Sequence, residues 1–419
     1  MEKINADLLK RSLLNKGTIS VLALVCIWNL LVPMELVKEQ LPLLVTFQLR
    51  FHQLLSYLDF RETSVSRVAI AEIDDQSFYY PPFSGTQPTN RRAIADLAKS
   101  AADGGAIVVA IDFQLKSPFT SPGDDAVRAD DNKYLLGVLG DLALKGIPVV
   151  ISCGLVRHGK KEWKREPNII DDGMLPAGIL VGYINLPIDK RQLPLEQVAW
   201  DWDGRTLKHF DSFALQIVSA FERVENIFPR TRDKKSIGRA LNQSEYAYGG
   251  FLKTSAFSHS IVSARDVLAG NDQIKKVFRG KIVIIGGDWH QFGENRGPLI
   301  ESFHSPVGDV PGLYLHANYV EALLDNRFRH AVPIWFGFGF DLVVGMLLYI
   351  FFDAVRRPGG RLAVLVVFFI PPFAAYILFA NFGLYFDFVL PLSLCFLHLG
   401  YSLVQDYLRI RRLLRAPVG

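Results

Sequence analysis

The chain has 419 residues, half of them hydrophobic, and a mean hydropathy of +0.19. This is too apolar for an average soluble enzyme, so we expect the surplus to be buried in lipid or in a large core, and the length allows two or three units. The formal net charge of +4 is small, and the basic residues are not gathered on one compact domain, so nucleic acid is a poor candidate partner.

The N-terminal region predicts a membrane anchor. Residues 18–36 form an apolar run long enough to cross a hydrocarbon core of about 30 Å, and Lys10, Arg11 and Lys16 precede it. A cleaved signal peptide is the alternative, but no small-x-small cleavage site follows the run, so we expect an uncleaved helix. Residues 41–58 are apolar at helical spacing and either continue this anchor or lie against the next domain.

Residues 37–331 predict one α/β domain, with a mixed, mostly parallel sheet and helices on both faces. Near-continuous apolar runs indicate buried strands, and they alternate with helices that end at glycines. The turn Asp203–Gly204 predicts a hairpin, which adds an antiparallel element. The predicted strands are residues 68–74, 106–112, 147–153, 178–186, 199–202, 206–210 and 281–286, and the predicted helices are residues 90–103, 124–145, 213–224, 263–270 and 314–324.

Three further apolar segments predict transmembrane helices 2 to 4, at residues 332–352, 362–380 and 388–404. Basic short loops face the cytoplasm in membrane proteins. The loop at residues 381–387 carries no lysine or arginine, whereas the loop between helices 2 and 3 and the tail after helix 4 are basic. The loop contains Arg356, Arg357 and Arg361, and the tail contains Arg409, Arg411, Arg412 and Arg415.

This distribution of arginines predicts a multi-pass protein of the cell inner (plasma) membrane. Residues 1–17 and the basic tail at residues 405–419 are then cytoplasmic, and residues 37–331 are extracytoplasmic, which means periplasmic in a bacterium. The lipid bilayer is the first expected partner.

Acidic residues follow three of the predicted strands: Asp74 and Asp75, Asp112, and Asp288. Ligands of open α/β sheets bind beyond the carboxyl ends of the strands, so these carboxylates are candidate ligand-binding residues. The alternative is that they cap helices or accept hydrogen bonds from turn amides. An acidic rim would suit calcium or magnesium, but the sequence has no EF-hand-like loop, and we expect no metal.

Other chemistry finds less support. His290, His304 and His316 fit no standard zinc spacing, although His316 is retained as a ligand-binding candidate. The run Gly286–His290 is not a dinucleotide fingerprint, because Trp289 and His290 are too bulky to cradle phosphate. There is no G-x-S-x-G elbow, so we expect no catalytic residue, no cofactor and no enzyme activity. Of the cysteines, only Cys153 lies outside an apolar span, which excludes a disulfide within the outer domain.

Three polar features remain. We expect the basic stretch around Trp163 to be a solvated loop, and contact with anionic lipid or a partner is the alternative. Asp341 and His398 are costly in mid-bilayer and could pair between helices 2 and 4. The arginines of the tail could bind anionic lipid, at about 1 kcal/mol for each basic residue, or dock on a cytoplasmic partner. The members of the basic stretch are Lys160, Lys161, Lys164 and Arg165.

Several of these motifs together resemble a known family. The segments are Val68–Asp75, Gly105–Phe113, Ala264–Gly270, Gly280–Gly286 and Val310–Ala317. In order and spacing they are similar to the second type of CHASE domain, the extracellular sensory module of bacterial cyclases and histidine kinases. The resemblance covers about residues 37–404, implies a sensory α/β domain, and matches Asp74, Asp112, Pro311, Gly312 and His316 to the family pattern.

The expected function follows from a difference from that family. Its members commonly continue into an effector domain, whereas here we expect none after the last helix. The leading hypothesis is a non-catalytic membrane receptor or scaffold that couples to a separate effector protein. The receptor itself could form an oligomer. A structural subunit of a larger membrane assembly is the alternative. A transporter that uses Asp341 and His398 and an outer-domain hydrolase have less support.

Overall fold

The computed structural model describes most of the predicted outer domain and short pieces beyond it. The chain divides into two compact units, one of residues 49–328 and one of residues 1–48 and 329–419. The described residues are 67–85, 89–115, 125–158, 162–172, 176, 178–186, 194–225, 248–249, 254–270, 272–305, 308–325, 328–332, 335–340, 342–343, 370, 372–378, 384–385, 404, 407–408 and 411.

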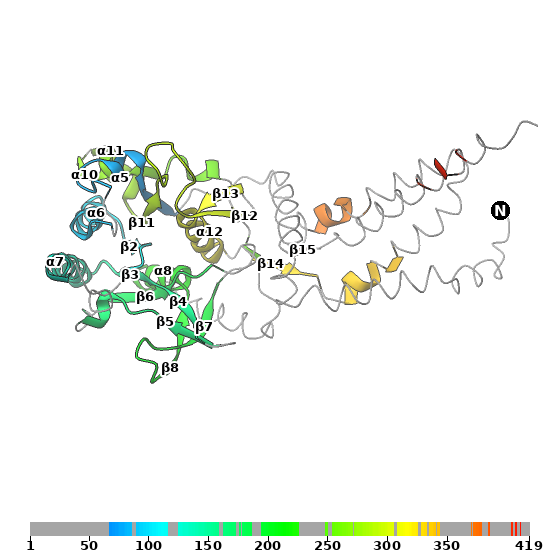
Figure 1. Cartoon of the computed structure of the whole chain (residues 1–419), viewed down its shortest axis with the longest axis horizontal. Coiled ribbons are helices and arrows are strands. Elements are labelled where there is room, and N and C mark those ends of the chain that lie inside the picture. Colours follow the sequence, from blue (N-terminus) through cyan, green and yellow to red (C-terminus); the bar gives the residue numbers. More distant parts are fainter. Residues whose placement is uncertain are drawn as a thin grey trace, which may run out of the picture. The chain divides into compact units, whose positions relative to one another are not determined.

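A six-stranded sheet with every neighbouring pair parallel forms the centre of the larger unit (Figure 1). Each strand is short and apolar, as expected for strands that are covered on both faces. The order across the sheet is β10 (Ile261–Ser263), β1 (Val68–Asp74), β11 (Ile282–Asp288), β2 (Val108–Ile111), β3 (Val149–Cys153) and β6 (Ile179–Tyr183).

Helices cover both faces of this sheet, so the α/β class with a mostly parallel sheet is confirmed. Alternate residues of β1 separate the two cores: Ala69, Ala71 and Ile73 face one side, and Val68 and Ile70 face the other. The first side is covered by α5 (Asp75–Tyr79), α6 (Arg91–Asp103), α7 (Asp125–Leu144), α10 (Ala264–Leu268) and α11 (Asp272–Phe278), and the second by α8 (Phe213–Val224) and α12 (Gly312–Leu324).

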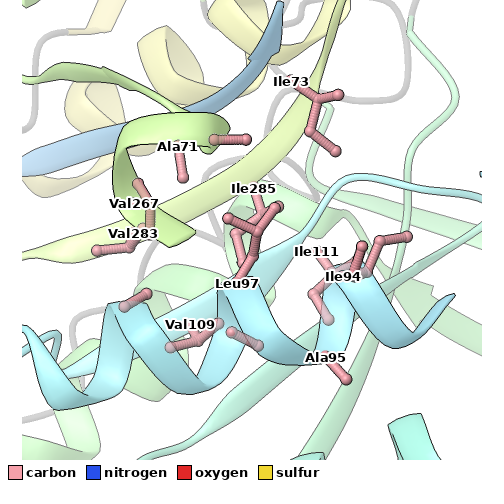
Figure 2. Close-up of a cluster of buried hydrophobic side chains, with 14 of the residues drawn as sticks. Ala71, Ile73, Ile94, Ala95, Leu97, Val109, Ile111, Val267, Val283 and Ile285 are labelled. Atoms are coloured by element: carbon pink, nitrogen blue, oxygen red, sulfur yellow. The ribbon is translucent and has the colours of Figure 1, made fainter. Parts of the chain in front are cut away.

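The helix α6 shows how local sequence sets this packing. The side chain of Asn90 accepts hydrogen bonds from the first-turn amides of Arg92 and Ala93, which is the role of an N-cap. Figure 2 shows Ile94 and Leu97 of α6 directed at the side chains of the sheet beneath it. The predicted bounds of this helix, residues 90–103, are confirmed within one residue.

A second, four-stranded sheet contains the predicted hairpin. It consists of β4 (Leu155–His158), β5 (Glu162–Arg165), β7 (Glu196–Trp200) and β8 (Leu207–Asp211), in that order. An isolated parallel bridge between Tyr183 and Ser212 connects it to the edge of the main sheet. The expectation of a solvated loop around Trp163 is wrong for the described part, because Trp163, Lys164 and Arg165 lie in β5.

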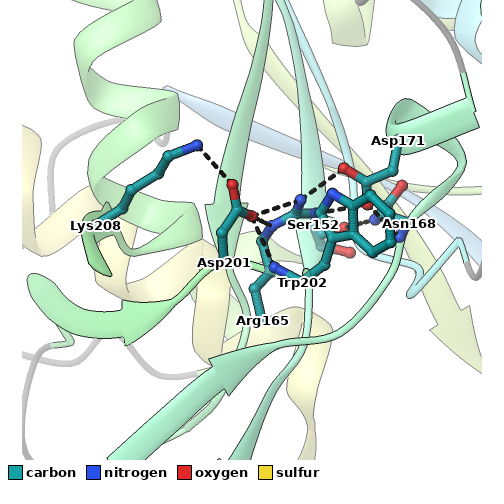
Figure 3. A network of polar contacts seen from close by, with 7 residues as sticks. All are labelled: Ser152, Arg165, Asn168, Asp171, Asp201, Trp202 and Lys208. Carbon is teal, nitrogen blue, oxygen red and sulfur yellow. Dashed lines mark hydrogen bonds and ion pairs between the residues drawn. The ribbon is translucent and has the colours of Figure 1, made fainter. Parts of the chain in front are cut away.

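A buried arginine holds this second sheet together (Figure 3). The guanidinium of Arg165 is 2.6 Å from Asp171 and 2.9 Å from Asp201, and its side chain is only 6% exposed. Lys208 also reaches Asp201, at 2.5 Å. The basic residue that sequence reasoning assigned to a surface is therefore an internal ion-pair partner.

The remaining elements are short. The strands β12 (Ser302–Ser305) and β13 (Gly308–Pro311) form an antiparallel hairpin, and β14 (Phe328–Ala331) pairs in parallel with β15 (Leu384–Tyr385). There are also two 3₁₀ turns, η2 (Ile169–Asp172) and η3 (Thr254–Phe257), and the two-residue strand β9 (Tyr248–Gly249).

The predicted transmembrane helices lie largely outside the described residues. Helical pieces at residues 335–340 and 372–378 fall within two of them. Among the residues that are described, no helix combines the length and the apolar character needed to cross a bilayer. Asp341, His398, Arg409, Arg412 and Arg415 lie outside the described residues, as does the segment 41–58, whereas Arg411 is described and exposed.

Candidate functional site

The parallel sheet brings the predicted strand-end carboxylates to one edge. Asp74 of β1 and Asp288 of β11 are directly paired in the sheet register. Asp112 follows β2, and its backbone amide donates to the carbonyl of Ile285 on β11 at 2.8 Å. Three neighbouring strands therefore end in aspartates, as the sequence predicted, but the four acidic side chains do different things.

Asp74 caps a helix. Its carboxylate accepts a hydrogen bond of 2.7 Å from the amide of Ser77, in the first turn of α5. This is the alternative that the sequence left open, and it accounts for Asp74 without any ligand.

Asp75 organises the loop after β11. Its carboxylate accepts hydrogen bonds from the backbone amides of His290 and Asn295, at 2.7 and 2.8 Å, and lies 2.7 Å from Nδ1 of the His290 ring. Burial opposes ionisation of Asp75, but these hydrogen bonds outweigh it and hold its pKa below the usual value. Asp75 is thus an ionised anchor for the loop.

The glycine-rich run at the end of β11 supports packing. The ring of Trp289 stacks on Phe78 of α5, with centroids 4.1 Å apart and planes 6° apart. A Cβ on Gly287 would lie 2.1 Å from that ring, so glycine is needed for the indole to fit. The space beside Gly287 is therefore filled by a core side chain.

Asp112 is different because burial is the influence that perturbs its carboxyl group. Its side chain is 7% exposed, and Nε2 of His316 lies 3.8 Å from its Oδ1 atom. Burial raises the pKa of Asp112 to about 7. The imidazole of His316 packs edge-on against Phe213, with centroids 5.4 Å apart, which fixes its place on α12.

Sequence reasoning missed Glu72, whose pKa is raised even higher than that of Asp112. Glu72 lies on the α12 side of β1, and the hydroxyl of Tyr314 donates to its carboxyl at 3.0 Å. Burial, together with a hydrogen bond and the charge of Asp288, raises the pKa of Glu72 to about 8. Burial also raises the pKa of Tyr314, so this hydroxyl remains a donor. The only clue was a glutamate at a strand position whose neighbours two residues away are buried.

Asp288 completes the group. Its Oδ1 atom is buried and has no hydrogen-bond partner within the part of the chain that the structure describes. We call Glu72, Asp112, Asp288, Tyr314 and His316 the edge cluster. It joins the ends of three strands to α12, which is the last helix before residue 328.

The three histidines that were considered as metal ligands do not converge. Each lies beside a different carboxylate: His290 beside Asp75, His304 beside Asp309, and His316 beside Asp112. No group of three or more histidine, cysteine or acidic side chains is arranged to hold a metal ion in the described ranges. Cys153 is buried, and burial raises the pKa of its thiol to about 12, which disfavours the reactive thiolate.

Comparison with known proteins agrees with this architecture. The family model described as the CHASE2 domain matches residues 21–351, most of the chain. No curated protein and no solved structure matches it. CHASE2 domains are sensory and typically extracellular. The resemblance found in the motifs is thereby confirmed, and the chain belongs to the CHASE2 domain family.

Proposed function

We propose that this protein is a non-catalytic membrane sensor. Its CHASE2 domain lies outside the cytoplasm, and its four transmembrane helices couple that domain to a separate effector protein. Membership of a family of extracellular sensory domains supports the sensory role. The arginines that flank the apolar segments support the orientation.

The pairing of β14 with β15 also supports the four-helix topology. His330 pairs with Leu384 and Ala331 with Tyr385. The first two residues directly precede predicted helix 2, and the other two lie in the arginine-free loop between predicted helices 3 and 4. Strands that pair must lie on the same side of a membrane, and two intervening spans satisfy this condition.

The observation that carries the proposal is that the edge cluster joins side chains of the sheet to side chains of α12. Tyr314 and His316 come from α12, and their carboxylate partners Glu72 and Asp112 come from the sheet. Seven residues separate the end of α12 from the predicted start of helix 2. An event that alters these contacts therefore acts on the helix that directly precedes predicted helix 2 in the chain, which supports coupling between the outer domain and that helix.

The low solvent exposure of the edge cluster favours a second candidate function, that of a constitutive subunit of a larger membrane assembly. The side chains of Asp112 and His316 are only 7% and 4% exposed, so a ligand larger than a proton or a water molecule would need the rim to open. In such a subunit the outer domain would serve for docking rather than for sensing.

Co-purification separates the two candidates. The tagged full-length chain is extracted in mild detergent with its natural neighbours, and the same is done with Asp112→Ala and with the exposed control Asp141→Ala on α7. A sensor is expected to retain a cytoplasmic effector in an amount that changes only in Asp112→Ala. A constitutive subunit retains the same partners in all three, and recovery as a lone monomer contradicts both candidates.

A further inference from the structure

The four-stranded sheet presents an apolar row on its exposed side. The register pairs β4 with β5, β5 with β7 and β7 with β8 at one level, and directly paired residues point to the same face. The row across the sheet consists of Val156, Lys164, Trp200 and Leu207. Val156 and Leu207 are 42% and 54% exposed, and Val198, two residues before Trp200 and so on the same face, is 40% exposed. We call the row and Val198 the outer face of the sheet.

The opposite face of this sheet is the one that packs on the rest of the domain. Leu155 and Ala199 are buried there, in a cluster with residues of β3 and β6. The ion pairs of Arg165 lie on the same side (Figure 3), because Arg165 follows Lys164 and successive side chains of a strand point to opposite faces. An antiparallel sheet with one covered face normally exposes polar side chains on the other. The outer face departs from this rule, and apolar side chains that gather on a surface mark interaction sites.

The charges around the outer face are of both signs. Lys164 lies in the row itself, whereas Glu162 and Glu196 lie on the same side of β5 and β7. Glu162 accepts a hydrogen bond of 3.0 Å from the indole of Trp200, and Glu196 pairs with His209 of β8. A surface with charges of both signs can complement a copy of itself about a two-fold axis. An anionic lipid surface, by contrast, attracts clusters of basic residues.

The size of the outer face favours a partner that is held close by. The strands have four or five residues each, and half of these point outward, so the sheet offers roughly ten side chains to a partner. Stable contacts between free proteins use about 20–30 residues on each side. A smaller contact is sufficient between chains that share one membrane, because their effective concentration is high. A second copy of this chain meets that condition, whereas a free soluble protein does not.

We propose that the outer face is the contact surface between two copies of this chain in one membrane, packed sheet on sheet about a two-fold axis. The inference rests on the proposed function for the membrane that holds the copies together. Sheets that pack face to face lie about 10 Å apart. An axis along the row places Leu207 opposite Leu207 of the other copy, and an axis along the strands places it opposite Val156.

Chemical cross-linking in native membranes tests the contact. In the full-length chain with its three native cysteines replaced by serine, Leu207→Cys and Val156→Cys are expressed singly and together. The membranes are then treated with a bis-maleimide that spans about 10 Å. We expect a cross-linked dimer in each single variant if the axis follows the row, and in the mixture if the axis follows the strands. The control Leu144→Cys, exposed on α7, should remain monomeric.

A charge placed on the outer face should break the contact. Val198→Asp, added to the same chains, should lower the cross-linked fraction by about tenfold or more, because the contact would bury a carboxylate without a cation. Val198→Thr, which keeps the branched shape and the strand preference, should lower it less. Hydrogen exchange of β5 and β7 checks that the sheet remains folded in both variants.

Three results would overturn the contact between copies and leave the sensor proposal intact. They are the absence of a dimer from all the Leu207→Cys and Val156→Cys samples, equal cross-linking of Leu144→Cys, and a dimer that both substitutions of Val198 leave unchanged.

A fluorophore at Leu207→Cys separates a second copy from the bilayer as the occupant. Bimane, whose emission shifts to the blue in apolar surroundings, should shift in proteoliposomes and not in nanodiscs that hold a single chain. A shift in both would show that lipid covers the face and would also overturn the inference. If alkaline washing releases the chain from native membranes, the membrane sensor is wrong instead, and the cross-links still decide whether copies meet through the outer face.

Discussion

Replacing Asp112 with asparagine should change how the stability of the CHASE2 domain depends on pH. The pKa of Asp112 is raised from 3.8 to about 7. Below about pH 4 the group is protonated in both the folded and unfolded states and contributes nothing. Between about pH 4 and pH 7 only the unfolded state ionises, so the free energy of unfolding falls by about 1.4 kcal/mol per pH unit. Above pH 7 the penalty is constant at about 4 kcal/mol.

The variant Asp112→Asn lacks this penalty. Its stability relative to wild type should therefore rise by up to about 4 kcal/mol from pH 4 to pH 8, whatever fixed cost the buried amide adds. Native-state hydrogen exchange of the β2 and β11 amides in the full-length chain measures this difference, with Asp141→Asn as the exposed control. Parallel curves for Asp112→Asn and wild type would refute the view that Asp112 is buried without compensation.

Three further substitutions test the packing. Gly287→Ala should displace Trp289 from Phe78 and lower the free energy of unfolding by about 1–3 kcal/mol, as measured by thermal unfolding and tryptophan fluorescence. The control Gly137→Ala, whose Cβ meets no atom within 4 Å, should be neutral or stabilising. Equal effects of the two substitutions would contradict the contact between Gly287 and Trp289. Arg165→Met should leave Asp171 without its cation and Asp201 with Lys208 alone, and it should cost about 3–5 kcal/mol, measured by hydrogen exchange of β5 and β7. Unchanged protection of these strands would show that the ion pairs of Arg165 are not structural. Asn90→Ala should cost about 1 kcal/mol through loss of the α6 cap, and Asn90→Asp, which keeps an acceptor, should restore most of the unfolding midpoint.

Much of the CHASE2 domain was predictable because local chemistry and burial agree there. Asn90 and Gly104 mark both ends of α6, and the continuous apolar runs of β1, β2, β3 and β11 allow little other than buried strands. The hairpin at Asp203–Gly204 follows from its turn residues. In each case a short stretch of sequence already contains the information that fixes the element.

Other elements depend on partners that are distant in sequence. The strand β10 has three residues and forms only because Ile70 and Ala71 of β1 offer it an edge. Likewise, β5 is rich in charge and becomes part of a sheet because Asp171 and Asp201 neutralise Arg165. No local pattern reveals such compensation in advance.

The candidate site was predictable only in its position. Parallel strands had to bring Asp112 and Asp288 to one edge, and the sheet does so. The separate roles of Asp74 and Asp75 could not be read from the sequence, because they depend on the amides of Ser77 and Asn295. Glu72 was missed because a lone glutamate in a strand gives no sign that Tyr314, 242 residues away, will meet it.

A sensory role outside the cytoplasm depends most directly on which side of the membrane the CHASE2 domain lies. Leu144, at the end of α7, is 83% exposed, and Arg411 in the basic tail is also exposed. In a chain whose three native cysteines are replaced by serine, Leu144→Cys and Arg411→Cys are treated with a membrane-impermeant maleimide on sealed, right-side-out spheroplasts. We predict labelling of Leu144→Cys at once and of Arg411→Cys only after permeabilisation. The reverse pattern would place the domain in the cytoplasm and contradict an extracytoplasmic sensor.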